Sequence, residues 1–126
     1  MLREVVSTLK ELGYKVVILG DVPTFESASN ICSPRPVYLR QKGCGITTSE
    51  LNRQIDIYNP FLQQLAYEQK ITYLPTNNRL LCGEENCSMV RNGVLLYRDK
   101  HHLNAHGSRL IGGDFATRLL ENSLVR

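Results

Sequence analysis

Two residues near the end of the chain could form the base of a serine hydrolase or acyltransferase site. Asp99 and His102 lie between a strand-like run and a helix-like run. An imidazole can accept the nucleophile's proton at one ring nitrogen while a nearby carboxylate holds the N–H of the other nitrogen. We expect the two side chains to lie within hydrogen-bonding distance, with His102 at the rim of a groove at the carboxyl ends of parallel strands.

The sequence contains no nucleophile turn to match this pair. No Gly-Asp-Ser or Gly-x-Ser-x-Gly run precedes Asp99. Gly20-Asp21 follows a strand-like run, but Val22 supplies no nucleophile and Pro23 would stop the helix that normally follows, so we interpret it as a loop. Ser108 is expected to be exposed or capping. The chain thus carries a base without its nucleophile, and we expect it to be inactive by itself.

Composition and charge favour one globular domain that binds no nucleic acid. The chain has 126 residues, 42% of them hydrophobic, which suits a single domain with its own core. Its formal charge of +3 comes from Lys and Arg scattered among Asp and Glu, which predicts a solvated surface. No apolar run reaches the roughly 18 residues that cross a membrane. The start of the chain is charged and amphipathic, and we find no targeting signal in it.

The four cysteines indicate an oxidising compartment. Cys32, Cys44, Cys82 and Cys87 lie in segments rich in Pro, Gly and Asn, where a reduced structural cysteine would not be expected. Their short separations predict two local disulfides, Cys32 with Cys44 and Cys82 with Cys87. Disulfides persist outside the cytoplasm. We therefore favour the rear portion of an exported protein, with its targeting segment upstream, over a cytosolic protein with free thiols.

Apolar periodicity predicts alternating helices and strands. The first half is expected to form a helix over 2–12, a buried strand over 15–20 and an irregular excursion over 21–47. A second helix should start from a Thr48 or Ser49 cap and be broken or kinked at Pro60, where Asn59 could cap a fresh start. A strand over 70–75, a helix or loop to Leu81, a hairpin over 88–97 that turns at Asn92-Gly93, and a helix over 105–121 should follow. Leu110, Ile111, Phe115, Leu119 and Leu120 are expected on one face of that last helix.

This order of elements predicts an α/β fold with parallel strands, a β-hairpin and helices on both sides. Such sheets usually hold roughly five strands. Here only two parallel strands and the hairpin are expected. The pattern of elements therefore predicts a sheet whose front half is missing from this sequence.

Two other interpretations use the same residues. Cys82-x4-Cys87 followed after fourteen residues by His102-x3-His106 approaches the Cys2His2 zinc spacing, which would make the chain a zinc-stabilised binding module. Against it, Asn104 and Gly107 interrupt the helix that would carry the histidines, and no basic reading helix is present. In the third interpretation the chain is a non-catalytic α/β interaction domain in which Asp99 and His102 have no chemical role.

The stretch from Cys82 to Ser108 resembles the end of the SGNH-type domain found at the C-terminus of membrane acyltransferase-3 proteins, the bacterial O-acetyltransferases of surface polysaccharides such as lipopolysaccharide. That family has a short cysteine loop and a Leu-Tyr-x-Asp-x-x-His-Leu-Ser-x-x-Gly stretch before its last helix. The chain has Cys82-x4-Cys87 and then Leu96-Tyr97-Arg98-Asp99-x-x-His102-Leu103-Asn104-x-x-Gly107. Its strand-like run 16–19 and the following Asp21-Val22-Pro23 also resemble the family's penultimate parallel strand and its Pro-bearing loop.

The resemblance implies that residues 1–126 are the C-terminal part of a single three-layer α/β/α SGNH-hydrolase-like domain. Asp99 and His102 match the catalytic Asp and His, while the family's Gly-Asp-Ser nucleophile, oxyanion-hole Gly and Asn would precede Met1. The implied reaction transfers an acyl group through a seryl ester to a sugar hydroxyl, with an acyl donor and a carbohydrate acceptor as partners and no metal or organic cofactor. The implied location is the periplasmic side of an inner-membrane protein that carries a membrane acyltransferase domain.

Overall fold

The computed structural model describes residues 1–32 and 43–125, and these residues form a mixed α/β fold. The elements in chain order are α1 (Leu2–Glu11), β1 (Val17–Leu19), the 3₁₀ helix η1 (Ser29–Ile31), β2 (Gly45–Thr47), α2 (Thr48–Gln69), β3 (Thr72–Leu74), the 3₁₀ helix η3 (Asn78–Leu80), β4 (Asn86–Ser88), β5 (Val90–Arg91), β6 (Val94–Leu95) and α3 (Ala105–Val125). Most boundaries fall within two residues of those expected from the sequence, and α3 runs four residues further.

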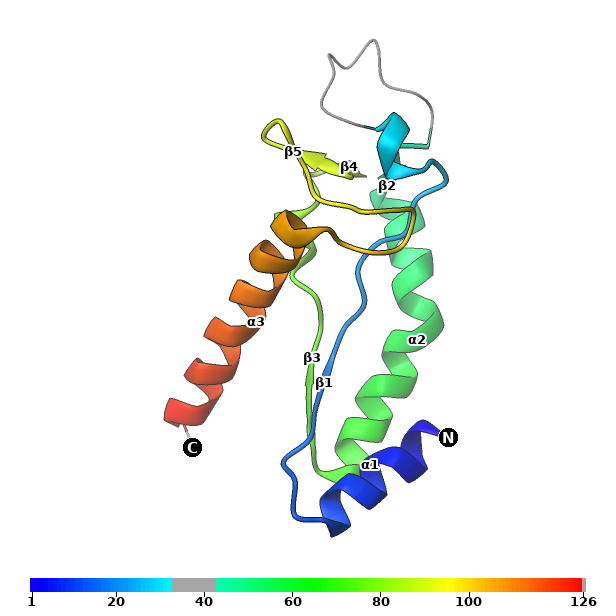
Figure 1. The fold of residues 1–126 in the computed structure, drawn as a ribbon. Helices are drawn as coiled ribbons and strands as arrows, with labels where there is room; N and C mark the ends of the chain where they lie inside the picture. Colours follow the sequence, from blue (N-terminus) through cyan, green and yellow to red (C-terminus); the bar gives the residue numbers. More distant parts are fainter. Residues whose placement is uncertain (33–42, 126) are drawn as a thin grey trace.

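The centre of the molecule is a parallel pair formed by β1 and β3. Val17 pairs with Thr72 and Leu19 with Leu74. The two strands run in the same direction, with α1 and α2 on one side and α3 on the other (Figure 1). Side-chain contacts hold the outer layers to this pair, because the Tyr73 hydroxyl donates to Asn59 Oδ1 on α2 and Arg118 on α3 donates to the Pro75 carbonyl. The predicted partial α/β/α arrangement is confirmed.

Two short antiparallel pairs lie beyond the carboxyl ends of β1 and β3. The hairpin of β5 and β6 turns at Asn92 (φ 50°) and Gly93 (φ 75°), the two positive φ values of a type I′ turn, as the Asn-Gly dipeptide predicts. The pairing of β2 with β4, which the sequence did not predict, sets Ile46 opposite Cys87. The irregular excursion expected over 21–47 therefore ends in a strand, and its residues 33–42 lie outside the described part.

Helix α2 differs from expectation at Pro60. The helix is continuous from Thr48 to Gln69, so a break at Pro60 is wrong, and Asn59 caps no new helix. Proline removes one backbone donor, but Leu65 and Ala66, one turn further on, are buried against the rest of the protein and hold the last turns in place. The N-cap is Thr47, one residue before the predicted pair of candidates, and its side chain accepts from the Glu50 N–H at 3.1 Å.

The apolar stripe predicted for α3 is only partly covered. Ile111 and Phe115 are buried and Leu119 packs against the core, whereas Leu120 is 67% exposed and Leu110 lies mostly at the surface. All five were expected on one face of the helix, whereas the burial of only three of them sets Leu110 and Leu120 apart from the covered side. The surface of the protein that packs against α3 is therefore narrower than the stripe of apolar residues on the helix.

The hydrophobic core is concentrated at the end of the molecule where β1 and β3 terminate. Its buried members are Phe25, Cys32, Cys44, Leu51, Leu74, Leu81, Cys82, Cys87, Met89, Leu96, Tyr97, Ile111 and Phe115. All four cysteines belong to it as two disulfides, Cys32–Cys44 and Cys82–Cys87, with Cα atoms 5.5 and 3.9 Å apart. By contrast β1 is poorly covered, since Val17 is 37% and Leu19 47% exposed.

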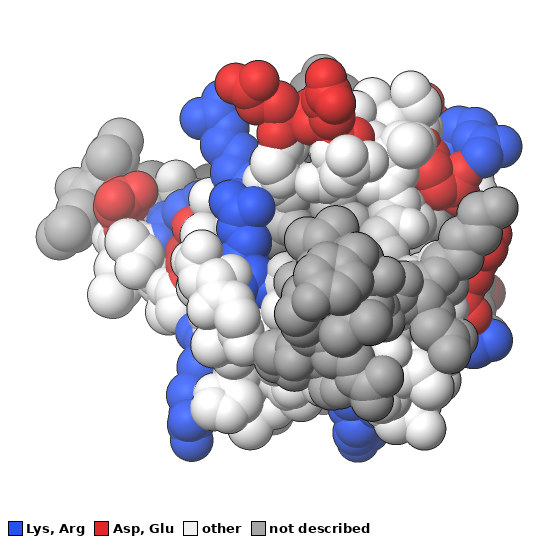
Figure 2. Space-filling model, turned by 90° about the horizontal axis from the view of Figure 1, so that it is seen from above, with Lys and Arg blue, Asp and Glu red and all other residues white. Residues whose placement is uncertain are grey.

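The surface of the described residues carries charges of both signs. Figure 2 shows Lys and Arg as separate groups with uncharged or acidic residues between them on the face seen there. This agrees with the scattered charge of the sequence. Across residues 1–32 and 43–125, no helix combines the length and apolarity needed to span a membrane.

Candidate functional site

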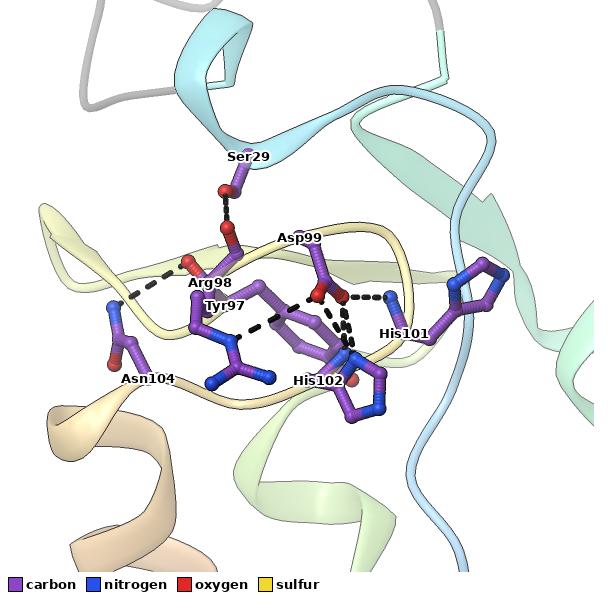
Figure 3. Close-up of polar contacts among 7 residues, drawn as sticks. All are labelled: Ser29, Tyr97, Arg98, Asp99, His101, His102 and Asn104. Atoms are coloured by element: carbon purple, nitrogen blue, oxygen red, sulfur yellow. Dashed lines mark hydrogen bonds and ion pairs between the residues drawn. The ribbon is translucent and has the colours of Figure 1, made fainter.

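Asp99 and His102, which we call the dyad, lie on the loop 98–103 between β6 and α3, which we call the dyad loop (Figure 3). His102 Nδ1 is 3.0 Å from Asp99 Oδ1 and 2.9 Å from Asp99 Oδ2. The neighbouring ring of His101 turns away from the carboxylate, and only its backbone N–H reaches Asp99. The two side chains that the sequence pointed to therefore lie within hydrogen-bonding distance of each other.

The Asp99 carboxylate also organises its own turn. Its Oδ1 accepts hydrogen bonds from the backbone N–H groups of His101 and His102, both at 2.8 Å. These donors, led by the His101 N–H and followed by the His102 side chain, lower the pKa of Asp99 to about 2. The carboxylate is thus ionised at neutral pH and favours the His102 tautomer with its proton on Nδ1. That tautomer leaves Nε2 as a proton acceptor.

Asn104 joins the dyad loop to α3. Its Oδ1 accepts from the Gly107 N–H at 3.0 Å, which makes it the N-cap of the helix, and its Nδ2 donates to the Leu95 carbonyl at 2.7 Å. Across the base of the loop, the Arg98 N–H donates to the His102 carbonyl at 2.8 Å. The first turn of α3 and the end of β6 are therefore held together directly beneath the dyad.

The other side of the loop rests on Pro23–Ser29, the segment that follows β1. The Tyr97 hydroxyl donates to the Pro23 carbonyl at 2.6 Å, the Phe25 N–H donates to the Lys100 carbonyl at 3.0 Å, and the Ser29 hydroxyl donates to the Arg98 carbonyl. Because this segment continues from the carboxyl end of β1, the dyad lies at the carboxyl ends of the parallel strands, where the sequence led us to expect it (Figure 1).

The dyad is open to solvent. The side chains of Asp99 and His102 are 43% and 63% exposed. One hollow of ≈ 210 Å³ lies between the loop after β1 and α2, and another of ≈ 480 Å³ lies beside Lys15, Lys70 and Leu119. Neither of these two is lined by a residue of the dyad loop, and the groove expected at His102 stays a prediction.

The serines in the described part of the chain do not reach the dyad. Ser29 donates to Arg98, the Ser88 hydroxyl accepts from the Val90 N–H, and Ser108 is exposed on α3, as expected. Gly20-Asp21 lies in a loop, in which Asp21 Oδ1 accepts from the Val22 N–H at 2.8 Å. None of the described serine hydroxyls bonds to His102.

The zinc interpretation loses two of its four ligands. Cys82 and Cys87 are joined to each other, so their sulfurs are not thiolates. His102 directs Nδ1 to Asp99, and no group of three or more His, Cys, Asp or Glu side chains within the described ranges could hold a metal ion. The spacing that suggested a zinc finger comes from a disulfide loop followed by the dyad loop.

Several residues that hold the dyad loop were not identified from the sequence. Asn104 had a local signal, the Asn-x-x-Gly spacing at a helix start. Tyr97 belongs to the stretch that resembles the family, but no local pattern indicates the partner of Tyr97 or of Ser29, because these partners are 74 and 69 residues away in the chain. Such contacts depend on the tertiary fold, and a single sequence does not encode them as a pattern.

Comparison with known proteins gives one match. Neither a search of curated proteins nor a search of solved structures found a relative. Residues 1–117 match the family described as "SGNH domain (fused to AT3 domains)", where AT3 denotes acyltransferase-3. The match includes β1, β3, both disulfides and the whole dyad loop. The chain therefore belongs to the SGNH domain family associated with acyltransferase-3 proteins.

Proposed function

We propose that this chain supplies the base half of an SGNH serine O-acyltransferase site, with His102 as general base and Asp99 as its orienting carboxylate. The observation that carries the proposal is the bond of 2.9 Å between His102 Nδ1 and an ionised Asp99, at the carboxyl ends of the parallel strands of an SGNH family member. In this arrangement the outward-facing Nε2 is the atom available to a nucleophile.

The reaction has two steps that use the same nitrogen. First, a serine hydroxyl loses its proton to His102 Nε2 and attacks the carbonyl carbon of the acyl donor, and the departing group takes that proton. A sugar hydroxyl then gives its proton to Nε2 and attacks the seryl ester, which returns the serine oxygen and its proton. Asp99 stabilises the imidazolium in both steps.

The serine would come from residues outside this sequence, on the remainder of the SGNH domain. The edge of β1 supports this. The Gly20 N–H donates to the Leu74 carbonyl at 2.7 Å. Because successive residues of a strand direct their backbone groups to opposite sides, the N–H and C=O of Leu19 point away from β3, toward the free edge of β1. The Val17 and Leu19 side chains are also partly exposed. A two-stranded sheet is also thin. A further parallel strand at this edge would end beside the dyad and could cover it.

The acceptor and location follow from the family and the disulfides. An acyl group, in the simplest case acetyl, would move from a donor delivered by the membrane acyltransferase domain to a hydroxyl of a surface polysaccharide. Two disulfides favour an oxidising, extracytoplasmic compartment. Within the proposal the chain needs no metal or organic cofactor, because the base, the carboxylate and a serine carry every proton transfer.

The test is complementation. The purified chain would be combined with the N-terminal half of an SGNH domain that carries the Gly-Asp-Ser turn, and hydrolysis of p-nitrophenyl acetate would be followed. The chain alone is expected to match free imidazole, and the combination to exceed it. His102→Ala should remove the gain, by up to roughly six orders of magnitude in kcat if the triad is complete. His101→Ala is the matched control, because its ring makes no bond to Asp99.

Two results would contradict the proposal. If the two halves form a complex and His102→Ala leaves its hydrolysis unchanged, the dyad has no catalytic role and the non-catalytic interaction domain is the better interpretation. If the chain alone gives a His102-dependent burst with an acyl adduct on one of its own serines, the site is complete without a second segment.

A further inference from the structure

We propose that Tyr97 is a positioning residue for the base, and that it acts together with Ser29 through the segment Pro23–Ser29, which we call the strap. The inference rests on the proposed function and adds to it the residues that fix where His102 stands. The hydroxyls of Tyr97 and Ser29 bond to the Pro23 and Arg98 carbonyls and not to His102 or Asp99. They act on the dyad through the backbone of the dyad loop and its neighbour.

The strap holds three residues around Asp99. Tyr97 is fixed by its hydroxyl on the Pro23 carbonyl at 2.6 Å and by its ring, which packs edge-on against Phe25 with centroids 4.9 Å apart. The Arg98 carbonyl accepts from the Ser29 hydroxyl. Beyond Asp99, the Lys100 carbonyl accepts from the Phe25 N–H at 3.0 Å. The carboxylate therefore projects from a stretch of backbone that is tied down on both sides.

The dyad side chains have no comparable support of their own. Asp99 and His102 bond to each other, to their own turn and, for Asp99, to the Arg98 side chain at 3.8 Å, all within the loop. These bonds give the turn no anchor to the sheet, so its order depends on the backbone that carries it. The position of His102 Nε2 relative to the sheet is therefore inherited from the strap contacts, and a displacement near 1 Å of a catalytic group can cost about a hundredfold in rate.

The strap is itself anchored to the layer on its far side. Gln54 on α2 makes two hydrogen bonds to Thr24, accepting from its N–H at 3.0 Å and donating to its carbonyl at 3.1 Å. The line of contacts thus runs from α2 through the strap to the dyad loop. Tyr97 suits its place in this line, because it is 1% exposed and burial raises its pKa, which keeps the hydroxyl protonated as a donor.

The test compares two tyrosines in the 126-residue chain by NMR. Tyr97→Phe keeps the buried ring and removes only the bond to Pro23. Tyr73→Phe is the matched control, since it removes a bond of 2.8 Å to Asn59, which lies on the middle of α2. Two readouts report on the dyad: the titration of the Asp99 carboxyl carbon and the hydrogen exchange of the His101 and His102 amides.

In Tyr97→Phe we expect exchange of both amides to rise by roughly two- to tenfold, as for the loss of one buried hydrogen bond. We also expect the pKa of Asp99 to move up from about 2 toward its ordinary value of 3.8. Tyr73→Phe should leave both readouts as in the wild type. Ser29→Ala, which removes the second anchor, should repeat the Tyr97→Phe pattern, and the double variant should exceed either single one.

The proposal is overturned if Tyr97→Phe and Ser29→Ala, each still folded, leave both readouts as in Tyr73→Phe. These readouts need no nucleophile, so they stand apart from the complementation assay. In an active combination of the two halves, Tyr97→Phe should lower kcat with KM unchanged, because Tyr97 does not touch a substrate. A released loop in a combination that lacks His102-dependent activity would uphold the strap and contradict the proposed function.

Discussion

Replacing Gly107 by alanine tests how closely α3 is pressed against the strand that leads into the dyad loop. A Cβ at this position would lie 2.2 Å from the Leu96 carbonyl oxygen and 2.9 Å from Leu103 Cδ2, against an ordinary contact distance of 3.4 Å or more. The nearer atom is backbone, which cannot rotate away. To accommodate the methyl group, α3 or the end of β6 must shift by about 1 Å, the difference between 2.2 and 3.4 Å.

The shift should cost more than alanine gains. Overpacking of this kind costs about 1–3 kcal/mol. Alanine recovers up to about 1 kcal/mol of helix propensity, and less in a first turn. The shift also disturbs the Asn104 cap, whose Oδ1 accepts from the N–H of the same glycine. The difference between the first two contributions is about 0–2 kcal/mol and the disturbed cap adds to the loss, so we expect Gly107→Ala to lower the free energy of unfolding by about 1–2 kcal/mol.

The same helix provides the controls. Gly112 and Gly113 are exposed, and a Cβ at either would meet nothing within 4 Å. Gly112→Ala and Gly113→Ala should each raise the free energy of unfolding by about 0.5–1 kcal/mol. Urea unfolding followed by circular dichroism measures all three variants. If Gly107→Ala is as stable as the two controls, the close approach of α3 to Leu96 is wrong, and so is the placement of the dyad loop that depends on it.

The disulfides and the Asp99 carboxylate give two further predictions. Thiol titration of denatured, unreduced protein should find no free thiol, and four reactive thiols would refute the two disulfides. Replacing both cysteines of a pair by serine should lower the free energy of unfolding, by about 2 kcal/mol for Cys82–Cys87 and about 3 kcal/mol for Cys32–Cys44, because the second pair closes the longer segment of chain. Because the pKa of Asp99 falls from 3.8 to about 2 on folding, its contribution to stability is complete above pH 4 and is lost as the pH drops toward 2. Unfolding of Asp99→Asn between pH 2 and 5 should lack this component, and equal pH profiles for the variant and wild type would contradict it.

The parts of the fold that depend on residues close together in the chain could be predicted from local sequence patterns. Asn92-Gly93 gave the hairpin because both φ values of its turn are positive, and the Asp99 and His102 pair was recognisable because three residues suffice to join the two side chains. Pro60 misled the prediction, since local propensity argues for a break while the buried residues after it keep the helix intact. The pairing of β2 with β4 joins segments about 40 residues apart and left no periodic trace.

The same distinction between local and long-range contacts applies to the site. The two chemical residues could be named from spacing and resemblance, whereas the contacts that fix their position could not. In the sequence Tyr97 is one more apolar residue at the end of a strand-like run. Its hydroxyl finds its partner, the Pro23 carbonyl, only in the folded protein, where the segment after β1 lies beside it. Reacting side chains are therefore easier to predict from a sequence than the backbone atoms that hold them in position.

The concentration of the core at one end of the molecule implies a gradient of local stability along the strands. Both disulfides and nearly all fully buried side chains lie near the dyad loop, while at the opposite end α1 buries only Val6 and leaves Val5 and Leu12 open to water. Opening should therefore start at α1 and at the amino ends of β1 and β3. A protease or a chaperone would meet that end first, and the loop that carries His102 would be among the last parts of the chain to lose its shape.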